Sequence, residues 1–145
     1  MWRFCIAILL LLAGCNVQEA ENTNESGAKL FRKLDSKATG IDFENKVSVT
    51  EDFDVFRYRN FYNGGGVGIA DLNNDGLADV FLTSNMGDNK LFLNKGNWKF
   101  EDITEKAGVK GTRIWSTGVS IADVNGDGLL DIYVCNAGDI NGENR

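Results

Sequence analysis

Hydrophobic and polar residues alternate over short stretches in the second half of the chain, a pattern typical of half-buried β-strands. One stretch leads into an acidic turn at residues 71–79, and a second stretch, VFLT, follows the turn at residues 80–83. The same order returns around residues 123–131, where the run after the turn is IYVC at 132–135. Each acidic turn is therefore predicted to join two neighbouring strands.

Between these two segments, the sequence NKLFLNKGNWKFEDIT predicts a β-hairpin. An alternating run at residues 91–94 is followed by turn residues at 95–97 and by a second run at 98–103. Upstream, residues 43–62 are predicted to form one or two further strands. Because the chain has no proline and 17 glycines, its tight turns must rest on glycine, asparagine and aspartate.

The chain repeats itself at a spacing of 52 residues. This shift places GVGIADLNNDGLAD, residues 66–79, on GVSIADVNGDGLLD, residues 118–131, with 10 of 14 positions identical. Four strands in a period of roughly 50 residues are typical of a propeller blade. The predicted fold class is therefore all-β, a partial β-propeller of about two blades over residues 40–145. Because a closed ring needs at least about four blades, we expect these blades to belong to a longer propeller.

The two acidic turns present oxygen atoms at regular positions. Side-chain oxygens stand at the first, third, fifth and ninth positions, and the seventh position offers its backbone carbonyl oxygen. Gly76 and Gly128 stand at the sixth position, where the chain must bend sharply. The predicted metal ligands are Asp71, Asn73, Asp75, Leu77 and Asp79 in the first turn, and Asp123, Asn125, Asp127, Leu129 and Asp131 in the second.

Calcium is the cation that this ligand set favours. It accepts about six to eight oxygens in adaptable geometry, whereas magnesium prefers a strict octahedron and transition metals prefer His or Cys. Three carboxylates in one turn repel one another by roughly 1–4 kcal/mol per pair at about 4 Å, and a divalent ion reverses that sign. An EF-hand would need Glu at the twelfth position, but Leu82 or Val134 stands there. An ion-free, Asx-rich hairpin turn stays open as the alternative.

The first fifteen residues, MWRFCIAILLLLAGC, have the pattern of a secretory signal peptide. One cation, Arg3, precedes an apolar run that is well short of the roughly 20 residues needed to cross a bilayer. The residues before Cys15 resemble the bacterial lipobox, which implies cleavage before Cys15 and lipid attachment to its sulfur. We therefore expect an exported lipoprotein anchored to the outer membrane or cell surface of a bacterium.

Residues 16–39 are predicted to be a polar tether that holds the folded region away from the membrane. Within this tether, a short helix is predicted that places Leu30, Phe31 and Leu34 on one side. Cys5 leaves with the signal peptide and Cys15 carries lipid, so Cys135 is left without a partner for a disulfide bond.

Composition excludes several function classes. The chain contains no histidine, which removes Ser/His/Asp and Cys/His catalytic arrangements and the usual zinc sites. Its formal net charge of −6 argues against a nucleic-acid partner and favours cations. The glycine run GGGVG at residues 64–68 lacks the Lys-Ser/Thr of a phosphate loop, so close backbone packing is the favoured interpretation.

Four aromatic residues are candidates for binding a sugar or a protein partner by stacking. We predict that most of them instead fill the seams between blades, because large aromatic side chains are usually buried. Stacking on a ligand remains the alternative. The four residues are Tyr58, Tyr62, Trp98 and Trp115.

The acidic turns and the strands before them resemble the FG-GAP/VCBS repeat family, whose members form calcium-stabilised propeller blades like those of integrin alpha heads. From about residue 40 onward, segments such as YNGGGVGIADLNNDGLADVFLTSN and WSTGVSIADVNGDGLLDIYVCNAG also resemble bacterial surface lipoproteins related to cartilage acidic protein. Those proteins often end in an ASPIC/UnbV module. The resemblance implies an extracellular binding or adhesion scaffold and implies no catalytic step.

The leading hypothesis is thus a calcium-binding, lipid-anchored propeller scaffold that binds an extracellular protein or glycan and is not an enzyme. One alternative is the non-catalytic framework of a secreted polysaccharide-degrading enzyme. A second alternative is a structural spacer that holds a distal domain away from the membrane.

Overall fold

The computed structural model describes residues 30–111 and 115–137. All of its helices and strands belong to the compact unit that begins at Lys33. The predicted signal peptide, Cys15 and residues 16–29 of the predicted tether lie outside the described residues.

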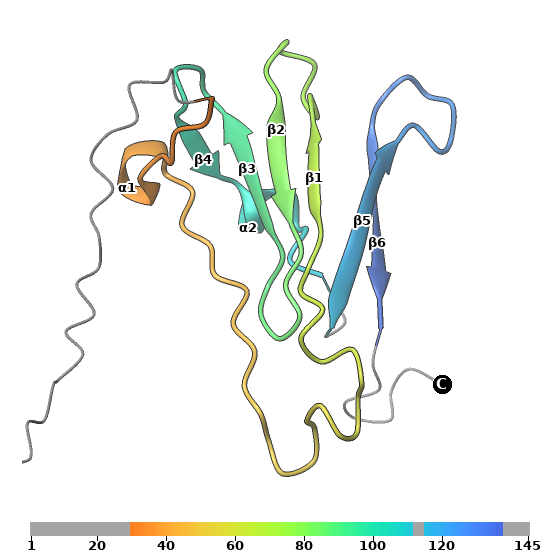
Figure 1. Ribbon diagram of the computed structural model, residues 1–145. Helices are drawn as coiled ribbons and strands as arrows, with labels where there is room; N and C mark the ends of the chain where they lie inside the picture. The colour runs from red at the N-terminus through yellow and green to blue at the C-terminus, as the bar shows by residue number, and fades with distance from the viewer. Residues whose placement is uncertain (1–29, 112–114, 138–145) are drawn as a thin grey trace, which may run out of the picture. The chain divides into compact units, whose positions relative to one another are not determined.

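The first sheet is a four-stranded antiparallel meander with the order β1-β2-β3-β4 (Figure 1). The acidic turn at 71–79 joins the first two strands, as predicted, and Ala70 pairs with Asp79 where that turn begins and ends. The predicted hairpin at 91–103 is confirmed, with a turn in which Lys95 N–H donates to the carbonyl oxygen of Lys99. The strands are β1 Val67–Ala70, β2 Asp79–Leu82, β3 Lys90–Asn94 and β4 Phe100–Asp102.

The second sheet contains β5 Ser116–Ala122 and β6 Asp131–Asn136, which pair antiparallel around the second acidic turn. Their register shifts between Ser116 and Val119. Strand β5 lies beside β1 of the first sheet, so the first strands of the two repeats face each other (Figure 1). This arrangement confirms the predicted fold class, a mostly β structure of two antiparallel sheets that is consistent with part of a propeller.

Glycine allows the two sheets to approach closely. A Cβ atom on Gly66 would lie 2.8 Å from both the carbonyl oxygen of Thr117 and the amide nitrogen of Val119. A Cβ on Gly68 would lie 2.7 Å from Cδ1 of Ile121. The glycine run at 64–68 therefore serves close backbone packing, as its sequence predicted.

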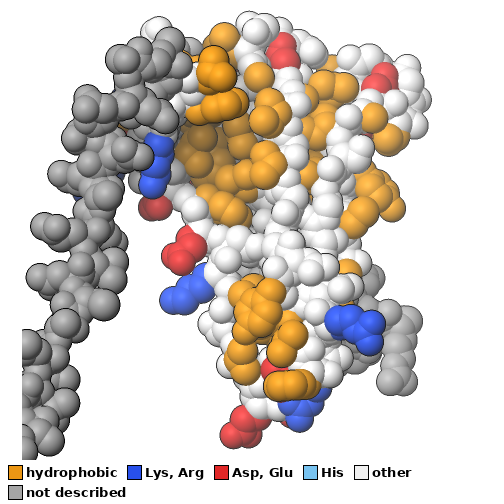
Figure 2. All heavy atoms as spheres, viewed as in Figure 1, with side chains coloured by type: hydrophobic (Ala, Val, Ile, Leu, Met, Phe, Trp, Pro, Cys, Tyr) orange, Lys and Arg blue, Asp and Glu red, His pale blue; other side chains and the backbone are white. Residues whose placement is uncertain are grey.

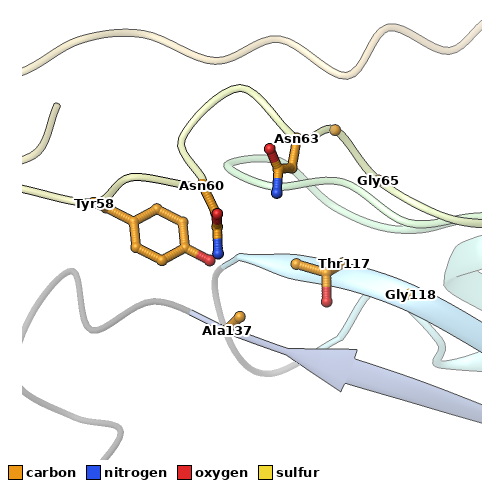
Figure 3. A pocket seen from close by; sticks show the side chains of 8 residues that line it. Tyr58, Asn60, Asn63, Gly65, Thr117, Gly118 and Ala137 are labelled. Atoms are coloured by element: carbon orange, nitrogen blue, oxygen red, sulfur yellow. The ribbon is translucent and has the colours of Figure 1, made fainter. Parts of the chain in front are cut away.

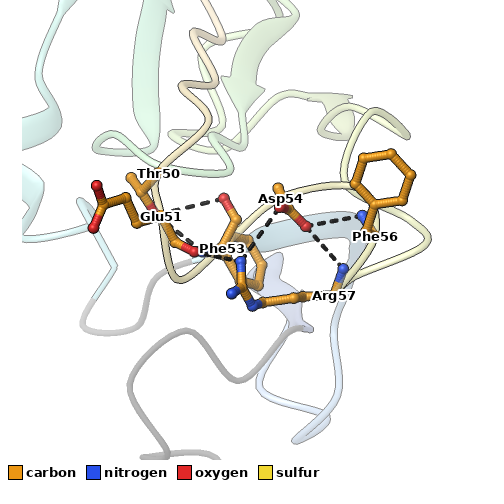
Figure 4. A network of polar contacts seen from close by, with 6 residues as sticks. All are labelled: Thr50, Glu51, Phe53, Asp54, Phe56 and Arg57. Atoms are coloured by element: carbon orange, nitrogen blue, oxygen red, sulfur yellow. Dashed lines mark hydrogen bonds and ion pairs between the residues drawn. The ribbon is translucent and has the colours of Figure 1, made fainter.

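The segment 43–62 contains no strand, so the prediction of one or two strands there is wrong. The carboxylate of Asp54 explains the difference, because it accepts hydrogen bonds from the backbone N–H groups of Phe56 and Arg57 at 2.9 Å each (Figure 4). Such local side-chain bonds offer the backbone an alternative to a strand ladder. Arg57 closes the turn by pairing with Asp54 and by donating to the carbonyl oxygen of Glu51.

An aromatic cluster forms where this irregular segment meets the start of β5. Phe53, Phe61 and Trp115 are at most 5% exposed and pack on one another. Tyr58 stacks on Phe53 with ring centroids 5.5 Å apart and meets the edge of Trp115 at 5.4 Å. Trp115 is thus buried, as predicted, and Tyr58 is half-buried against the same cluster. The prediction of buried aromatic side chains is wrong for Tyr62 and Trp98, which are 65% and 67% exposed.

The short helix predicted within residues 16–39 is shorter than expected and begins later. Helix α1, Ser36–Thr39, begins after Asp35, whose side chain accepts from the N–H of Lys37. Leu30 and Phe31 precede the helix and are each 90% exposed, so they form no buried side of it. The second helix, α2, Thr104–Ala107, follows β4. No helix in the described part of the chain is long and apolar enough to span a membrane.

One face of the four-stranded sheet remains apolar and open to solvent. The register places Val67 beside Leu82 and Ile69 beside Val80, so all four residues share that face. Val67 is 61% exposed and Ile69 is 66% exposed. Figure 2 shows hydrophobic side chains gathered over this sheet. In a propeller, such a face is buried against a neighbouring blade.

Replacing Gly66 with Ala should destabilise the fold by about 1–3 kcal/mol, because the added methyl group meets the backbone of β5. Gly118→Ala is the matched control, since its Cβ would meet no atom within 4 Å and neither glycine has a positive φ. We expect the control to change the free energy of unfolding by less than about 1 kcal/mol. Urea denaturation measures both effects, and equal losses would contradict the close approach of β1 and β5.

Candidate metal centre

The two acidic loops occupy equivalent positions in the two sheets. The first, residues 71–79, joins β1 to β2, and the second, residues 123–131, joins β5 to β6. In Figure 1 both loops lie at the same end of their sheets, at the top of the view. The repeat therefore brings two chemically similar loops to one edge of the folded unit.

In the first loop, acidic side chains bind the backbone of their own turn. The carboxylate of Asp71 accepts from the N–H groups of Asp75 at 3.0 Å and Gly76 at 2.8 Å. Asp75 accepts from the N–H of Leu77 at 2.9 Å and from the side-chain amide of Asn73, also at 2.9 Å. Gly76 has a φ of 84°, a left-handed conformation that glycine adopts without strain. These bonds fix Asp71, Asn73 and Asp75 in one compact turn.

The second loop repeats this pattern bond for bond. Asp123 accepts from the N–H groups of Asp127 at 3.2 Å and Gly128 at 2.8 Å. Asp127 accepts from the N–H of Leu129 at 2.8 Å and from the amide of Asn125 at 2.9 Å. The second loop adds one bond, from the N–H of Gly126 to Asp123 at 2.7 Å. Two different sequences thus produce the same arrangement of side-chain oxygens.

The ninth residue of each loop holds the loop closed, but its surroundings differ between the copies. Asp79 is fully buried, and its two carboxylate oxygens accept from the N–H groups of Leu72 at 2.9 Å and Asn94 at 2.8 Å. It therefore ties the acidic loop to β3. Asp131 accepts from the N–H of Val124 at 3.0 Å, and within the described residues no strand lies on the far side of β6.

The electrostatics of the loops favour a cation. None of the ion pairs between described residues involves a loop carboxylate, so no Lys or Arg side chain neutralises these acids there. The backbone N–H of Gly128, together with those of Gly126 and Asp127, holds the pKa of Asp123 below its ordinary value, although burial opposes this effect. The carboxylate is therefore ionised at neutral pH, as a metal ligand must be.

The donor set fits a calcium ion in its chemistry. The loops offer carboxylate, amide and carbonyl oxygens, which are the ligands that calcium prefers. Each carboxylate oxygen has two lone-pair sites, so accepting one N–H leaves it able to bind a cation as well. Among the described residues, however, no group of three or more His, Cys, Asp or Glu side chains converges on one point.

The spacing of residues did not predict the contact between Asp79 and Asn94. The loop spacing marks Asp79 only as a metal ligand. Its second donor, the backbone N–H of Asn94, lies fifteen residues away and has no signature in the sequence. A hint was available in Asn94 itself. Asn94 stands at the end of a predicted strand, before a glycine turn. In the structure it bonds the end of the acidic loop twice: its backbone N–H donates to Asp79, and its side-chain amide donates to the carbonyl oxygen of Ala78 at 2.9 Å.

Comparison with known proteins confirms the resemblance of the repeat. Residues 71–134 match the family model described as FG-GAP-like repeat. Cartilage acidic protein 1 of Xenopus tropicalis is 38% identical over 87 residues, which cover 59% of this chain and 13% of that protein. The Mus musculus and Homo sapiens proteins of the same name are 37% and 36% identical, and the matched part covers 12% of each. No solved structure gives a significant match.

These matches cover only a small part of the relatives. The chain spans about one eighth of the length of the curated relatives it matches. Within that span, the FG-GAP-like repeat and the cartilage acidic protein relatives suggest an extracellular, propeller-like scaffold.

In the presence of a chelator, Asp79→Asn should destabilise the fold by about 1–3 kcal/mol, because an amide group cannot accept two backbone hydrogen bonds with two oxygens. Asp131→Asn is the matched control: it removes the same charge from an equivalent loop, but only one N–H bonds to it in the described structure. We expect a loss below about 1 kcal/mol for the control. Urea denaturation compares the two variants, and a similar loss in both would refute the tie between Asp79 and β3.

Proposed function

We propose that this chain, whose residues 71–134 match the family model described as FG-GAP-like repeat, is a calcium-stabilised propeller scaffold held at the bacterial cell surface by a lipid anchor. In this role it binds an extracellular protein or glycan and carries out no reaction. Its partners are calcium, the membrane that holds the anchor and the extracellular ligand, and they do not include nucleic acid.

The matched geometry of the two acidic loops is the observation that carries this proposal. Both loops hold the first, third and fifth side chains in the same hydrogen-bonded arrangement, although the loops differ at several positions. An ordinary turn needs one such carboxylate, and further acids without basic partners destabilise it by mutual repulsion. A bound divalent cation accounts for the excess of negative charge in each loop.

Calcium in these loops would stabilise the ends of the strands. The proposed ligands are those of the predicted set: Asp71, Asn73, Asp75, Leu77 and Asp79, and Asp123, Asn125, Asp127, Leu129 and Asp131. The ion supplies positive charge that balances the carboxylates. The protein's own residues orient the ligands, because the N–H groups at the fifth, sixth and seventh positions already fix the acidic side chains.

The lipid anchor rests on the amino-terminal sequence. A cation, a short apolar run and small residues before Cys15 form the pattern of a lipoprotein signal peptide. Several acyl chains on one residue anchor a protein stably where a single chain does not. The polar residues that follow Cys15 would then serve as the tether between the membrane and the folded unit.

Calcium should raise the melting temperature of the full chain by several degrees relative to the same sample in excess chelator. A ligand at about 100 times its Kd adds about 2.7 kcal/mol to the free energy of unfolding. Asp71→Ala should abolish one of the two calcium sites measured by isothermal titration calorimetry. Asp88→Ala serves as the control, since this exposed carboxylate pairs with Lys110 outside both loops. Identical melting with and without calcium would refute the proposal.

The lipid anchor has its own test. When the full chain is produced in a Gram-negative bacterium, we expect mass spectrometry to find acyl groups on Cys15 and the protein to partition into detergent. Cys15→Ser should abolish both properties. Cys5→Ser should leave them unchanged, because that residue belongs to the segment that is cleaved off. An unmodified Cys15 would exclude this form of anchoring.

A further inference from the structure

A second feature lies at the end of the β5–β6 hairpin opposite its acidic loop. A cavity of about 340 Å³ opens between the loop at residues 58–65, the start of β5 and Ala137, which follows β6 (Figure 3). Its lining includes the side chains of Tyr58, Asn60 and Asn63. Strand β5 is seven residues long, so roughly 20 Å separates this cavity from the acidic loop at the far end of the strand.

The chemistry of the cavity is polar but uncharged. Among the described residues, no Lys, Arg, Asp or Glu lines it. The side chains of Asn60 and Asn63 are exposed, and neither makes a hydrogen bond to another described residue. Each amide presents two N–H donors and one acceptor oxygen. Figure 3 shows both amides directed toward the space between the loop and β5. The hydroxyl of Tyr58 lies beside the amide of Asn60.

The walls of the cavity are held rigidly before any ligand arrives. The ring of Tyr58 stacks on Phe53, with 19° between the ring planes, and meets Trp115 edge-on. The buried side chain of Asn85 donates to the carbonyl oxygens of Gly64 at 3.1 Å and Ser116 at 2.9 Å, which joins the loop to the start of β5. A preformed wall lowers the entropy that a ligand must overcome on binding.

We propose that this cavity is a binding site for one neutral sugar residue of a glycan, contacted by the amides of Asn60 and Asn63 and the hydroxyl of Tyr58. A sugar carries adjacent hydroxyl groups that both donate and accept, and side-chain amides pair with both functions. The cavity volume lies at the lower end of the range of small-molecule sites, which suits one or two sugar rings. Because no described lining residue carries a charge, an anionic or cationic ligand would find no charged partner among them, which disfavours such ligands.

This inference narrows the binding role proposed above to a class of ligand, but its evidence is independent of the acidic loops. The cavity is built from residues 58–65, the start of β5 and Ala137, none of which is a proposed calcium ligand. Calcium binding and sugar binding can therefore be measured on the same samples and can fail separately.

The test titrates the full chain, in calcium, with D-galactose, D-mannose or N-acetyl-D-glucosamine and follows binding by saturation-transfer and chemical-shift NMR. D-glucuronate is the charged comparator, and a capped glycine–serine–glycine peptide represents a protein ligand. We expect at least one neutral sugar to bind. Its Kd should rise about tenfold or more in Asn60→Ala/Asn63→Ala, because two hydrogen bonds are lost, and about threefold in Tyr58→Phe.

Matched controls separate the cavity from the rest of the fold. Ser120→Ala, an exposed position of β5 outside the lining, should leave the Kd for the sugar within about twofold of the unchanged protein. Tyr58→Phe keeps the aromatic packing, and the two asparagine side chains are exposed, so each variant should fold. Calcium titration of the same samples checks that each variant is folded. The proposal is overturned if none of the three neutral sugars binds, if binding is unchanged in the asparagine double variant, or if glucuronate or the peptide binds as tightly as the best neutral sugar.

Discussion

The structure depends on the close approach of β1 and β5, where backbone meets backbone with little side chain between. Gly66 and Gly68 leave room for this approach, and hydrogen bonds then lock it. Thr83 accepts from the N–H of Gly66 and donates to the carbonyl oxygen of Thr117, each at 2.5 Å. Asn85 joins the segments before β1 and at the start of β5. Because no buried side-chain nitrogen or oxygen among the described residues lacks a partner, this polar seam carries no desolvation penalty from an unpaired group.

The two ends of the β5–β6 hairpin differ in their chemistry. At one end, acidic side chains fold back on their own backbone and leave an excess of negative charge at the surface. At the other end, the side chains of Asn60, Asn63 and Tyr58 line a cavity to which the described residues contribute no charged side chain. A cation at the first end would strengthen the turn without touching the second. The strand between them is the rigid element that both ends share.

The sequence predicted the regular parts of this fold because they follow a repeating pattern. Period-two alternation and the 52-residue repeat located the strands around both acidic turns, and the hairpin at 91–103 followed from its glycine turn. Residues 43–62 were mispredicted because Asp54 bonds the backbone of its own turn and because Phe53 and Phe61 pack on a distant residue, Trp115, rather than on a paired strand. The apolar Leu30 and Phe31 suggested a helix, but Asp35 caps the chain further on and the helix begins only after it. The Asp35 cap is a local signal that hydrophobic periodicity does not record, whereas long-range aromatic contacts depend on tertiary structure.

The candidate site shows the same limit, and the difference between its two copies explains why. Spacing alone makes Asp79 and Asp131 equivalent, yet Asp79 is buried against Asn94 whereas Asp131 has no third strand beside it in the described structure. The ninth carboxylate of the loop therefore acquires its second partner only when the blade gains its third strand. A carboxylate fixed by one backbone N–H group of its own loop and one of a neighbouring strand would lose less freedom when a cation binds nearby. A cation bound to the loop would therefore be thermodynamically coupled to completion of the blade, since whatever binds the folded loop stabilises the strand pairing that positions it.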